Sequence, residues 1–385
     1  MKPINMYDPT RDYNNYKQEY DSAIQSVLNK GLFIQGPEVL DLERNLSEYV
    51  GARFCISCAN GTDALFISLL ALDINPGDEI ITVAHTWIST AEVIPLVKAK
   101  PIFVDINVKT FNIDIKQIER AITPKTKAII PVSLYGRIAN LEKIKHIADR
   151  YSIANGCNIA IIEDGAQSFG ASKNGMKSCS CKYSTIATTS FFPSKPLGAY
   201  GDAGAIFTND EALALKIRAI KSHGGLERFK HKYIGLNSRL DTLQAAILLV
   251  KLRKLDAVLN LRNDVAEYYN QKLGRNKNIR LPKFKPTHFQ VWAQYSILLE
   301  DKKVRSYMID GLKKAGINCA IFYPAPLHLQ ECFNYLEYKH GSLPVTELVA
   351  DNIINLPCYA EITKVEQDYI IENFGHLLEK YYSSS

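Results

Sequence analysis

Short apolar runs alternate with helical patterns along the first half of the chain, and this alternation limits the possible folds more than any other feature. The runs are rich in β-branched residues, and the segments between them repeat apolar residues at the spacing of an amphipathic helix. Strands that are apolar along their whole length, each followed by a helix, are typical of a mostly parallel sheet covered on both faces. The sequence therefore predicts an α/β domain. Its strand-like runs are residues 54–59, 79–84, 101–106, 127–135 and 159–164.

Two further runs, residues 184–192 and 203–210, lie close together in the chain and contain more small residues. We expect them to extend or edge the same sheet. Ahead of the first run, residues 36–51 have helical spacing and stop at Gly51, which predicts a helix there.

The second half of the chain indicates a separate domain. From Leu240 to Gly274 the apolar residues keep helical spacing with few helix breakers, which predicts one long helix. With 385 residues the chain exceeds the size at which a single core usually stops growing. We therefore expect a large α/β domain over residues 1–260 and a small C-terminal α+β domain over residues 261–385, with the boundary inside that helix.

The distribution of charge and the composition of the first residues argue against nucleic acid and membranes as partners. The 46 basic and 40 acidic residues give a formal net charge of +6, and no segment concentrates the basic ones as nucleic-acid or membrane arms do. Residues 1–16 lack the apolar stretch of a signal peptide, and no stretch approaches the length of a membrane span. We expect a cytoplasmic protein that binds neither nucleic acid nor a membrane.

The cysteines raise the question of a metal site. Eight cysteines are too few for a disulfide scaffold in a chain of this length. Cys55 and Cys58 are spaced like zinc ligands, and Cys179 and Cys181 lie in a polar segment. However, the first pair lies in a strand-like run, where residues three apart point to opposite faces. We expect no metal.

In an open parallel sheet, ligands bind beyond the carboxyl ends of the strands, so the residues just after each apolar run are the candidate functional residues. One of them, Lys195, stands between Pro193 and Pro196 in a turn that both prolines stiffen, although a solvated lysine needs no such frame. The other residues at strand ends are Asn60, Gly61, Thr62, His85, Thr86, Trp87 and Asp164.

Gly61 and Thr62 stand at a strand-to-helix turn. Backbone N–H groups and a hydroxyl at the positive end of a helix are suited to a phosphate, although Asn60 or Thr62 could equally be an ordinary helix cap. No G-x-G-x-x-G follows the first turn and no G-x-x-x-x-G-K-[ST] occurs, which disfavours nicotinamide dinucleotides and ATP.

The remaining set fits pyridoxal 5′-phosphate (PLP). Its aldehyde needs an amine, such as that of Lys195, and its ring nitrogen needs a carboxylate, such as that of Asp164. Trp87 offers a flat face for the ring, and Ser190 could reach the phosphate. The alternatives are a helix cap or buried salt bridge for Asp164, a core aromatic for Trp87 and a surface hydroxyl for Ser190.

Several blocks together resemble the DegT/DnrJ/EryC1/StrS family of PLP-dependent nucleotide-sugar aminotransferases. The similarity runs in order from about residue 30 to about residue 360. It implies an aminotransferase of fold type I with a seven-stranded sheet, which uses glutamate as the amino donor. The blocks include "GPEVLDLE", "ANGTDALFISLLAL", "IIEDGAQSFGA", "SFFPSKPLGAYGDAGAIFTND", "NSRLDTLQAAIL" and "YPAPLHLQ".

The resemblance also implies roles for single residues. Lys195 would bind the cofactor covalently, Asp164 would pair with its ring nitrogen, and Gln167 would lie beside its phenolic oxygen. Thr62 and Ser190 would hold its phosphate. Asn237, in "NSR", would reach the phosphate of the partner subunit's cofactor, which implies a homodimer with composite active sites.

The blocks look closest to the subgroup that aminates C3 of UDP-2-acetamido-2-deoxy-3-oxo-glucuronate for surface polysaccharides. Arg239 could then pair with the uronate carboxylate. Tyr323 and His328 are candidate substrate contacts, or packing residues at the domain junction. The alternatives are an aminotransferase for a dTDP- or UDP-linked keto-6-deoxyhexose, and a non-catalytic regulatory or structural dimer.

The chain departs from the common family blocks at two positions. Thr86-Trp87 stands where relatives have Thr-Phe or Thr-Tyr, and Gly165 stands where many have alanine or cysteine.

Overall fold

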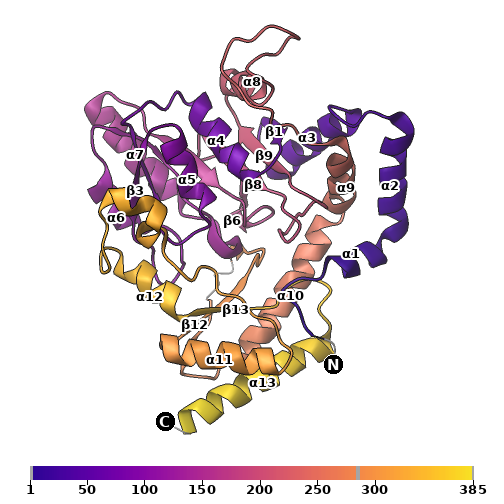
Figure 1. Cartoon of the computed structure of the whole chain (residues 1–385), viewed down its shortest axis with the longest axis vertical. Helices are drawn as coiled ribbons and strands as arrows, with labels where there is room; N and C mark the ends of the chain where they lie inside the picture. The colour runs from indigo at the N-terminus through magenta and orange to yellow at the C-terminus, as the bar shows by residue number, and fades with distance from the viewer. Residues whose placement is uncertain (1–2, 283–286, 384–385) are drawn as a thin grey trace.

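The computed structural model describes residues 3–282 and 287–383 and has a central seven-stranded sheet (Figure 1). β9 runs antiparallel to both of its neighbours, whereas all other neighbouring pairs are parallel. This confirms the predicted α/β fold with a mostly parallel sheet. In spatial order the strands are β1 (Phe54–Cys58), β9 (Gly204–Thr208), β8 (Ile186–Ser190), β5 (Ala160–Asp164), β4 (Thr126–Ile129), β2 (Glu79–Val83) and β3 (Lys100–Val104).

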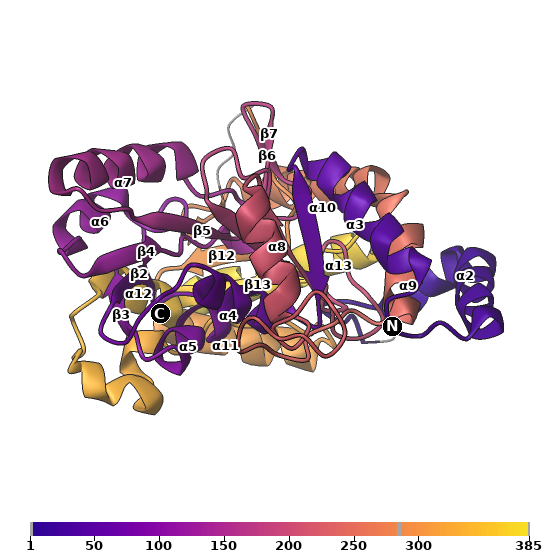
Figure 2. The same cartoon turned by 90° about the horizontal axis from the view of Figure 1, so that it is seen from above.

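Helices cover both faces of this sheet, as Figure 2 shows from above. Successive residues of one strand, such as Ile80 and Ile81 in β2, pack into cores on opposite faces. Both residues are fully buried, which explains why the strands are apolar along their whole length. The core on one face contains α4 (Gly61–Ala71), α5 (Ser89–Leu96) and α8 (Glu211–Ile220). The cores on the other face contain α3 (Pro37–Val50) and α9 (Thr242–Leu252), and α6 (Ile115–Ala121) and α7 (Leu141–Asn155).

The two runs whose place was left open lie inside the sheet. β8 and β9 separate β5 from β1, so that β1 and not β9 forms the edge. The predicted strand over 127–135 is shorter in the structure, because β4 ends at Ile129. Pro131 follows, and it has no N–H to donate to a neighbouring strand.

The prediction of one long helix from Leu240 to Gly274 is wrong. The structure has α9 and then α10 (Leu255–Leu273), with a break at Arg253 and Lys254. No glycine or proline marks this break, so the helical spacing continues through it in the sequence. The break is set by packing, because α9 lies against α3 and α2 (Lys17–Lys30) whereas α10 continues to α13 (Lys364–Ser383) in the second domain.

The second domain is built on a small antiparallel sheet of β10 (Ile279–Arg280), β12 (Tyr295–Leu299) and β13 (Ile353–Leu356). Leu259 of α10 packs into a core under the large sheet and Val265 into the core around the small sheet, and the domain boundary near residue 260 stays a prediction. Ile4 also packs into the second core, so the start of the chain lies against the C-terminal part. This part of the chain also contains α11 (Lys302–Lys314), α12 (Pro344–Asn352) and the short 3-10 helices η2 (Leu327–Leu329) and η3 (Glu331–Leu336).

The remaining elements are short. α1 (Pro9–Asn15) precedes α2, and a three-stranded sheet of two-residue strands contains β6 (Ser172–Lys173), β7 (Met176–Lys177) and β11 (His288–Phe289). No helix within residues 3–282 and 287–383 combines the length and the apolar composition that crossing a bilayer requires.

Candidate active site

Most of the predicted cofactor-binding residues follow strands whose carboxyl ends lie at one edge of the sheet. Contacts connect them into a single cluster: Thr62 lies against Ser89 of α5, and Thr90 of α5 bonds to Asp164 at the end of β5. The charges of Asp164 and Lys195 act on each other. The fold thus brings together residues that are more than a hundred positions apart in the chain.

Asp164, the last residue of β5, is a buried and oriented carboxylate. It is only 4% exposed, and its Oδ2 accepts a hydrogen bond from Thr90 Oγ1 at 2.8 Å while its Oδ1 accepts one from the Ala166 N–H at 3.1 Å. Burial raises the pKa of Asp164, and the two hydrogen bonds and the charge of Lys195 oppose that shift. A carboxylate in this environment favours a cation that can replace the lost hydration.

Lys195 lies in the turn after β8, where its backbone N–H donates to the Phe192 oxygen at 2.8 Å. Burial lowers the pKa of the Lys195 amine, and the negative charge of Asp164 opposes that shift. The amine therefore loses its proton more readily than a solvated lysine does. A neutral amine is what a nucleophile or a base requires.

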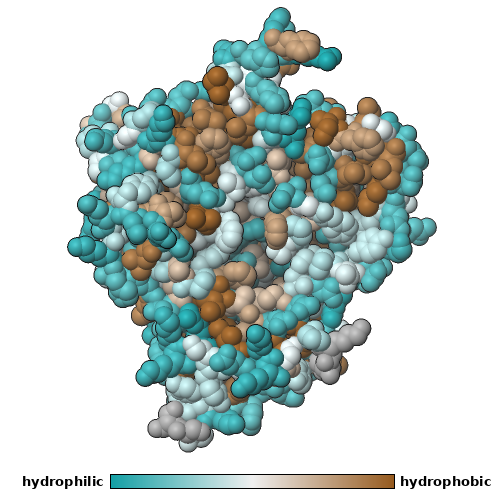
Figure 3. All heavy atoms as spheres, in the orientation of Figure 1, coloured by the Kyte–Doolittle hydropathy of each residue, from teal (hydrophilic) through white to brown (hydrophobic). Residues whose placement is uncertain are grey.

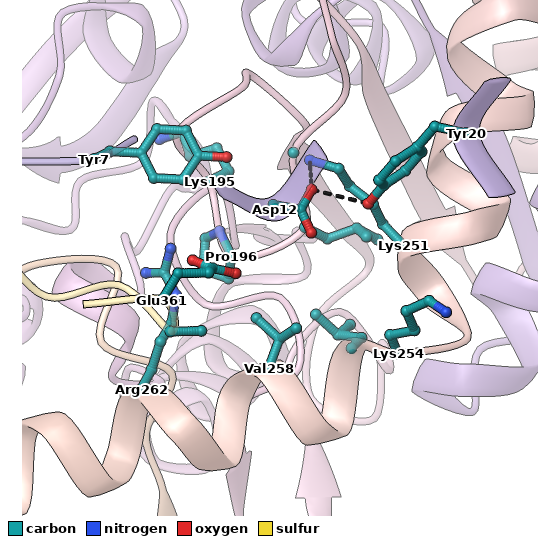
Figure 4. Close-up of a pocket in the computed structure, with 14 residues that line it drawn as sticks. Tyr7, Asp12, Tyr20, Lys195, Pro196, Lys251, Lys254, Val258, Arg262 and Glu361 are labelled. Atoms are coloured by element: carbon teal, nitrogen blue, oxygen red, sulfur yellow. Dashed lines mark hydrogen bonds and ion pairs between the residues drawn. The ribbon is translucent and has the colours of Figure 1, made fainter. Parts of the chain in front are cut away.

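Lys195 also lines a cavity that faces the N-terminal helices and α10 (Figure 4). On the far side of this cavity Asp12 accepts a hydrogen bond from Tyr20 at 2.8 Å and pairs with Lys251 at 3.1 Å. Burial lowers the pKa of Lys251 and raises that of Glu361, which also lines the cavity. Ionisable side chains therefore surround Lys195 on the side of this cavity as well as on the side of Asp164.

The turn between β1 and α4 has the form of a phosphate site. Asn60 caps the helix with its side chain, and Thr62 Oγ1 lies 2.7 Å from Ser89 Oγ. A Cβ on Gly61 would stand only 2.7 Å from the Cβ of Ser190, so glycine is what lets Ser190 approach the helix start. The Thr62 and Ser190 hydroxyls therefore lie close to the N-terminus of α4, where an anion is favoured.

Gln167 is buried and has both ends of its amide occupied. Its Oε1 accepts from the Tyr135 N–H at 2.8 Å, and its Nε2 donates to the Tyr323 hydroxyl at 2.9 Å. Tyr323 comes from the second domain, so this contact brings a predicted substrate residue to a predicted cofactor residue. Trp87 lies beside Tyr323 with 6.2 Å between ring centroids, and it is 60% exposed, which excludes the alternative of a core aromatic.

Asn237 and Arg239 lie on the segment between α8 and α9. Ser238 between them is fully buried, and its Oγ accepts from the Ala59 N–H at 3.2 Å, which ties the segment to the end of β1. Asn237 is exposed and Arg239 is partly buried. The structure therefore places both residues near the phosphate turn, and their roles stay predictions.

His328 has the contacts of a packing residue, which is the alternative that the sequence left open. It is 1% exposed, and its Nε2 lies 3.0 Å from Glu347 Oε1. Its ring packs against Tyr338 rather than against the strand-end residues. Among the described residues the contacts of His328 are those of packing, and its role in substrate binding stays a prediction.

Sequence reasoning missed two residues of the cluster, Thr90 and Tyr135. It placed His85 at a strand end but gave it no role. Tyr135 is the last residue of the predicted run 127–135, so its position at the end of an apolar run was a usable signal. Thr90 lies inside a helix, and nothing in the sequence indicates that it faces Asp164.

Gly165, which departs from the common family block, has a packing explanation. A Cβ at this position would stand 2.6 Å from the sulfur of Cys179 and 3.0 Å from the Thr188 oxygen. The side chain of Cys179 therefore fills the space that a larger residue at 165 would need. In the part of the chain that the structure describes, no group of three or more His, Cys, Asp or Glu could hold a metal ion.

The cluster as a whole fits PLP. An amine with a lowered pKa, a buried carboxylate that forms no ion pair among the described residues, an anion site at a helix start and an exposed indole occur together. They match the aldehyde, ring nitrogen, phosphate and ring face of this cofactor.

Comparisons with known proteins agree with this chemistry. The chain is similar to the UDP-2-acetamido-2-deoxy-3-oxo-D-glucuronate aminotransferase of Pseudomonas aeruginosa, with 47% identity over 92% of this chain and 95% of that protein. It is also similar to a pleiotropic regulatory protein of Geobacillus stearothermophilus, with 42% identity over 97% of this chain and 98% of that protein.

The fold is shared with the crystal structure of NtdA from Bacillus subtilis with bound cofactor PMP. The TM-score is 0.90 at 33% identity, and the match covers 98% of this chain and 86% of that chain. Residues 14–375 match the model of the DegT/DnrJ/EryC1/StrS aminotransferase family. These findings confirm the predicted enzyme class and PLP as the cofactor, and they show that the chain belongs to the DegT/DnrJ/EryC1/StrS aminotransferase family.

Proposed function

We propose that this enzyme transfers an amino group from glutamate to the 3-keto group of UDP-2-acetamido-2-deoxy-3-oxo-glucuronate, to form an aminated sugar for a surface polysaccharide. The observation that carries the proposal is the 47% identity, over nearly the whole chain, to an enzyme named for this substrate. Arg239 adds a chemical argument, because its guanidinium group could recognise the uronate.

When bound, PLP supplies the aldehyde that accepts the amino group and a ring that delocalises electrons. Lys195 then acts as the base, since its amine with a lowered pKa can take the proton from the α-carbon of glutamate. In the second half of the reaction Lys195 delivers a proton to C3 of the sugar, the transferred nitrogen ends on that carbon, and the keto oxygen leaves as water. The two half-reactions predict ping-pong kinetics.

Other residues hold the reacting groups in place. Asp164, fixed by Thr90 and the Ala166 N–H, provides a negative charge for the cofactor's ring nitrogen. Thr62 and Ser190 offer hydroxyls to the phosphate at the start of α4, where the helix dipole also favours an anion. Positioning at both ends of the cofactor keeps the reacting carbon within reach of the amine.

Replacing Arg239 with glutamine tests the substrate. Charge-assisted hydrogen bonds contribute about 1.5–3 kcal/mol, so we expect the KM for the uronate sugar to rise by roughly 10- to 100-fold. The measurement is the rate at which the keto-sugar, made in situ by a dehydrogenase, restores the visible absorption that glutamate has bleached. A nucleotide-linked keto-6-deoxyhexose, which has no carboxylate, serves as the control substrate. If only the deoxy sugar restores the absorption, the alternative substrate class is correct and the Arg239 argument fails.

We further propose that the enzyme is a homodimer with composite active sites. The loop between α8 and α9 projects from the top of the molecule, and Figure 3 shows apolar atoms on it and over the N-terminal helices. On this loop Phe229 is 81% exposed and Ile234 is 94% exposed. Exposed apolar residues of this size favour a protein partner. Because Asn237 lies three residues after Ile234, a second copy docked on the loop would receive Asn237 near its own site.

A charged residue on the projecting loop should disrupt this dimer. We expect the wild-type protein to have twice the chain mass of 43.2 kDa in solution, and Ile234→Asp to shift it toward that single mass with loss of activity. The measurement is light scattering after size exclusion. Ile153→Asp is the matched control, because Ile153 is 84% exposed on α7, and it should keep the mass and the activity. A monomeric, fully active wild-type enzyme would contradict the proposal.

We assign the enzyme to the cytoplasm. Each of the eight cysteines is a free thiol in the structure. A reducing compartment keeps thiols in that state.

A further inference from the structure

Tyr135 connects segments of the active site that are far apart in the sequence. Its backbone N–H donates to Gln167 Oε1, and its hydroxyl donates to the backbone oxygen of Phe322. Gln167 Nε2 in turn donates to the hydroxyl of Tyr323. Because Phe322 and Tyr323 are neighbours in the chain, these three hydrogen bonds form a closed ring of four residues. The ring joins the segments after β4 and β5 to a segment of the second domain.

His85 contacts this ring of four residues through Tyr135. It follows β2, is fully buried, and places its Nε2 2.8 Å from the Tyr135 hydroxyl. That hydroxyl has a single proton, which it donates to Phe322, so His85 must be the donor in their contact. Burial lowers the pKa of His85 to about 3, so its imidazole is neutral at physiological pH and carries its single N–H proton on Nε2.

Phe322 is held from both domains. Its N–H donates to Asn355 Oδ1 in β13 at 2.9 Å, and its oxygen accepts from Tyr135 in the first domain. The neighbouring ring of Tyr323 lies edge-on to His85, with 6.1 Å between centroids. The backbone before Tyr323 and the ring of Tyr323 are therefore both fixed by groups that the catalytic mechanism does not use.

The Tyr323 hydroxyl has an unused hydrogen-bond donor. It accepts a hydrogen bond from Gln167, and among the described residues its own proton has no acceptor. Its ring stands beside the exposed indole of Trp87, at the mouth of the site. The oxygen of this hydroxyl accepts a hydrogen bond from the protein, and its proton is free to be donated. Such a hydroxyl can donate a hydrogen bond to an oxygen atom of a ligand.

We propose that His85 and Tyr135 are positioning residues that hold Tyr323 so that its hydroxyl donates a hydrogen bond to an oxygen of the bound substrate. The proposal rests on the proposed aminotransferase function, because the ligand is the substrate of that reaction. His85 and Tyr135 themselves touch neither substrate nor cofactor.

The first test measures the position of the segment without any substrate. Tyr135→Phe removes only the hydroxyl, and we expect amide hydrogen exchange in residues 320–328 to become about ten-fold faster, since one buried backbone acceptor loses its partner. Tyr269→Phe is the matched control, because the Tyr269 hydroxyl also donates to a buried backbone oxygen, that of Pro357, in the core of the second domain. His85→Leu should reproduce the effect, whereas His85→Gln, which keeps a donor, should largely restore the wild-type exchange.

The second test is a double-mutant cycle on the two half-reactions. Tyr323→Phe should weaken substrate binding about ten-fold, seen in KM more than in kcat, and Tyr135→Phe should show the same pattern. If Tyr135 acts through Tyr323, the double variant should be no worse than either single variant. Multiplied effects in the double variant, or a Tyr323→Phe enzyme with wild-type kinetics, would overturn the proposal.

The outcomes also separate this proposal from the proposed function. If the wild-type enzyme does not aminate the uronate sugar, the substrate assignment fails, while the exchange experiment and the glutamate half-reaction still test the positioning role. If the enzyme is active but Tyr135→Phe leaves the exchange of residues 320–328 at the level of Tyr269→Phe, the positioning role is wrong and the function stands.

Discussion

A Lys195→Ala enzyme is expected to lose at least about four orders of magnitude in the rate of both half-reactions. Proton transfer by a positioned side chain contributes about 10²–10⁴-fold by itself, and this variant also loses the amine that binds the cofactor. The protein should still fold, because among the described residues the Lys195 side chain makes no ion pair or hydrogen bond. Stopped-flow absorption after mixing with glutamate measures the loss.

The covalent role of Lys195 has its own readout. Borohydride treatment of the wild-type holoenzyme should fix the cofactor to the peptide that contains Lys195, as detected by mass spectrometry, and the variant should carry no such mass. Lys254→Ala is a suitable control, since Lys254 lines the same cavity but pairs with Glu19. Cofactor fixed to another lysine in the wild-type enzyme would show that the assignment is wrong.

An Asp164→Asn enzyme is expected to have the second-largest defect, about 10- to 1,000-fold in rate and in affinity for PLP. A nearby opposite charge shifts a pKa by about 1–3 units, and each unit corresponds to a tenfold change in an equilibrium constant. Asparagine keeps the size of the side chain and can still accept from Thr90, so the loss isolates the charge. The measurements are the half-reaction rates and a PLP titration.

Glu163→Gln is the matched control for Asp164. Glu163 is the neighbouring buried acid of β5, and it bonds to Ser178 and the Cys179 N–H rather than to the site cluster. We expect this control to lower the melting temperature and to keep the affinity for PLP. Equal losses of PLP affinity in the two variants would mean that Asp164 acts through the fold and not through its charge.

Lowering the pH should reproduce the Asp164 defect in the wild-type enzyme. Because burial raises the pKa of Asp164 above its ordinary value of 3.8, the carboxylate takes up a proton at a higher pH than an exposed aspartate would. The affinity for PLP should therefore fall as the pH drops through that raised pKa. The affinity of Asp164→Asn should depend less on pH over the same range, which a titration at several pH values can check.

The positions of the strands and helices of the first domain could be predicted from the sequence. Runs such as 54–59 and 159–164 are apolar throughout because both faces of the sheet are covered, and this local pattern survives in any arrangement of the strands. The same reasoning places Asp164, Gly61 and Lys195 at one edge, because the parallel strands that precede them end there. The family blocks then added the cofactor and the enzyme class.

Other features depend on contacts between distant segments, which a local pattern does not encode. The break between α9 and α10 has no glycine or proline, and it exists because the two helices pack against different partners. His328 stands in a family block, yet its ring is buried against Glu347.

The sequence by itself determined the α/β fold class, the strand-end location of the site, and the chemical groups that bind PLP. The tertiary structure alone decided which groups surround them: Thr90 on Asp164, Cys179 against Gly165, and the ring of hydrogen bonds through Tyr135. The physical reason is that periodicity and turn residues report the local environment of a segment. Burial, pKa shifts and hydrogen-bond partners arise only when segments far apart in the chain pack together.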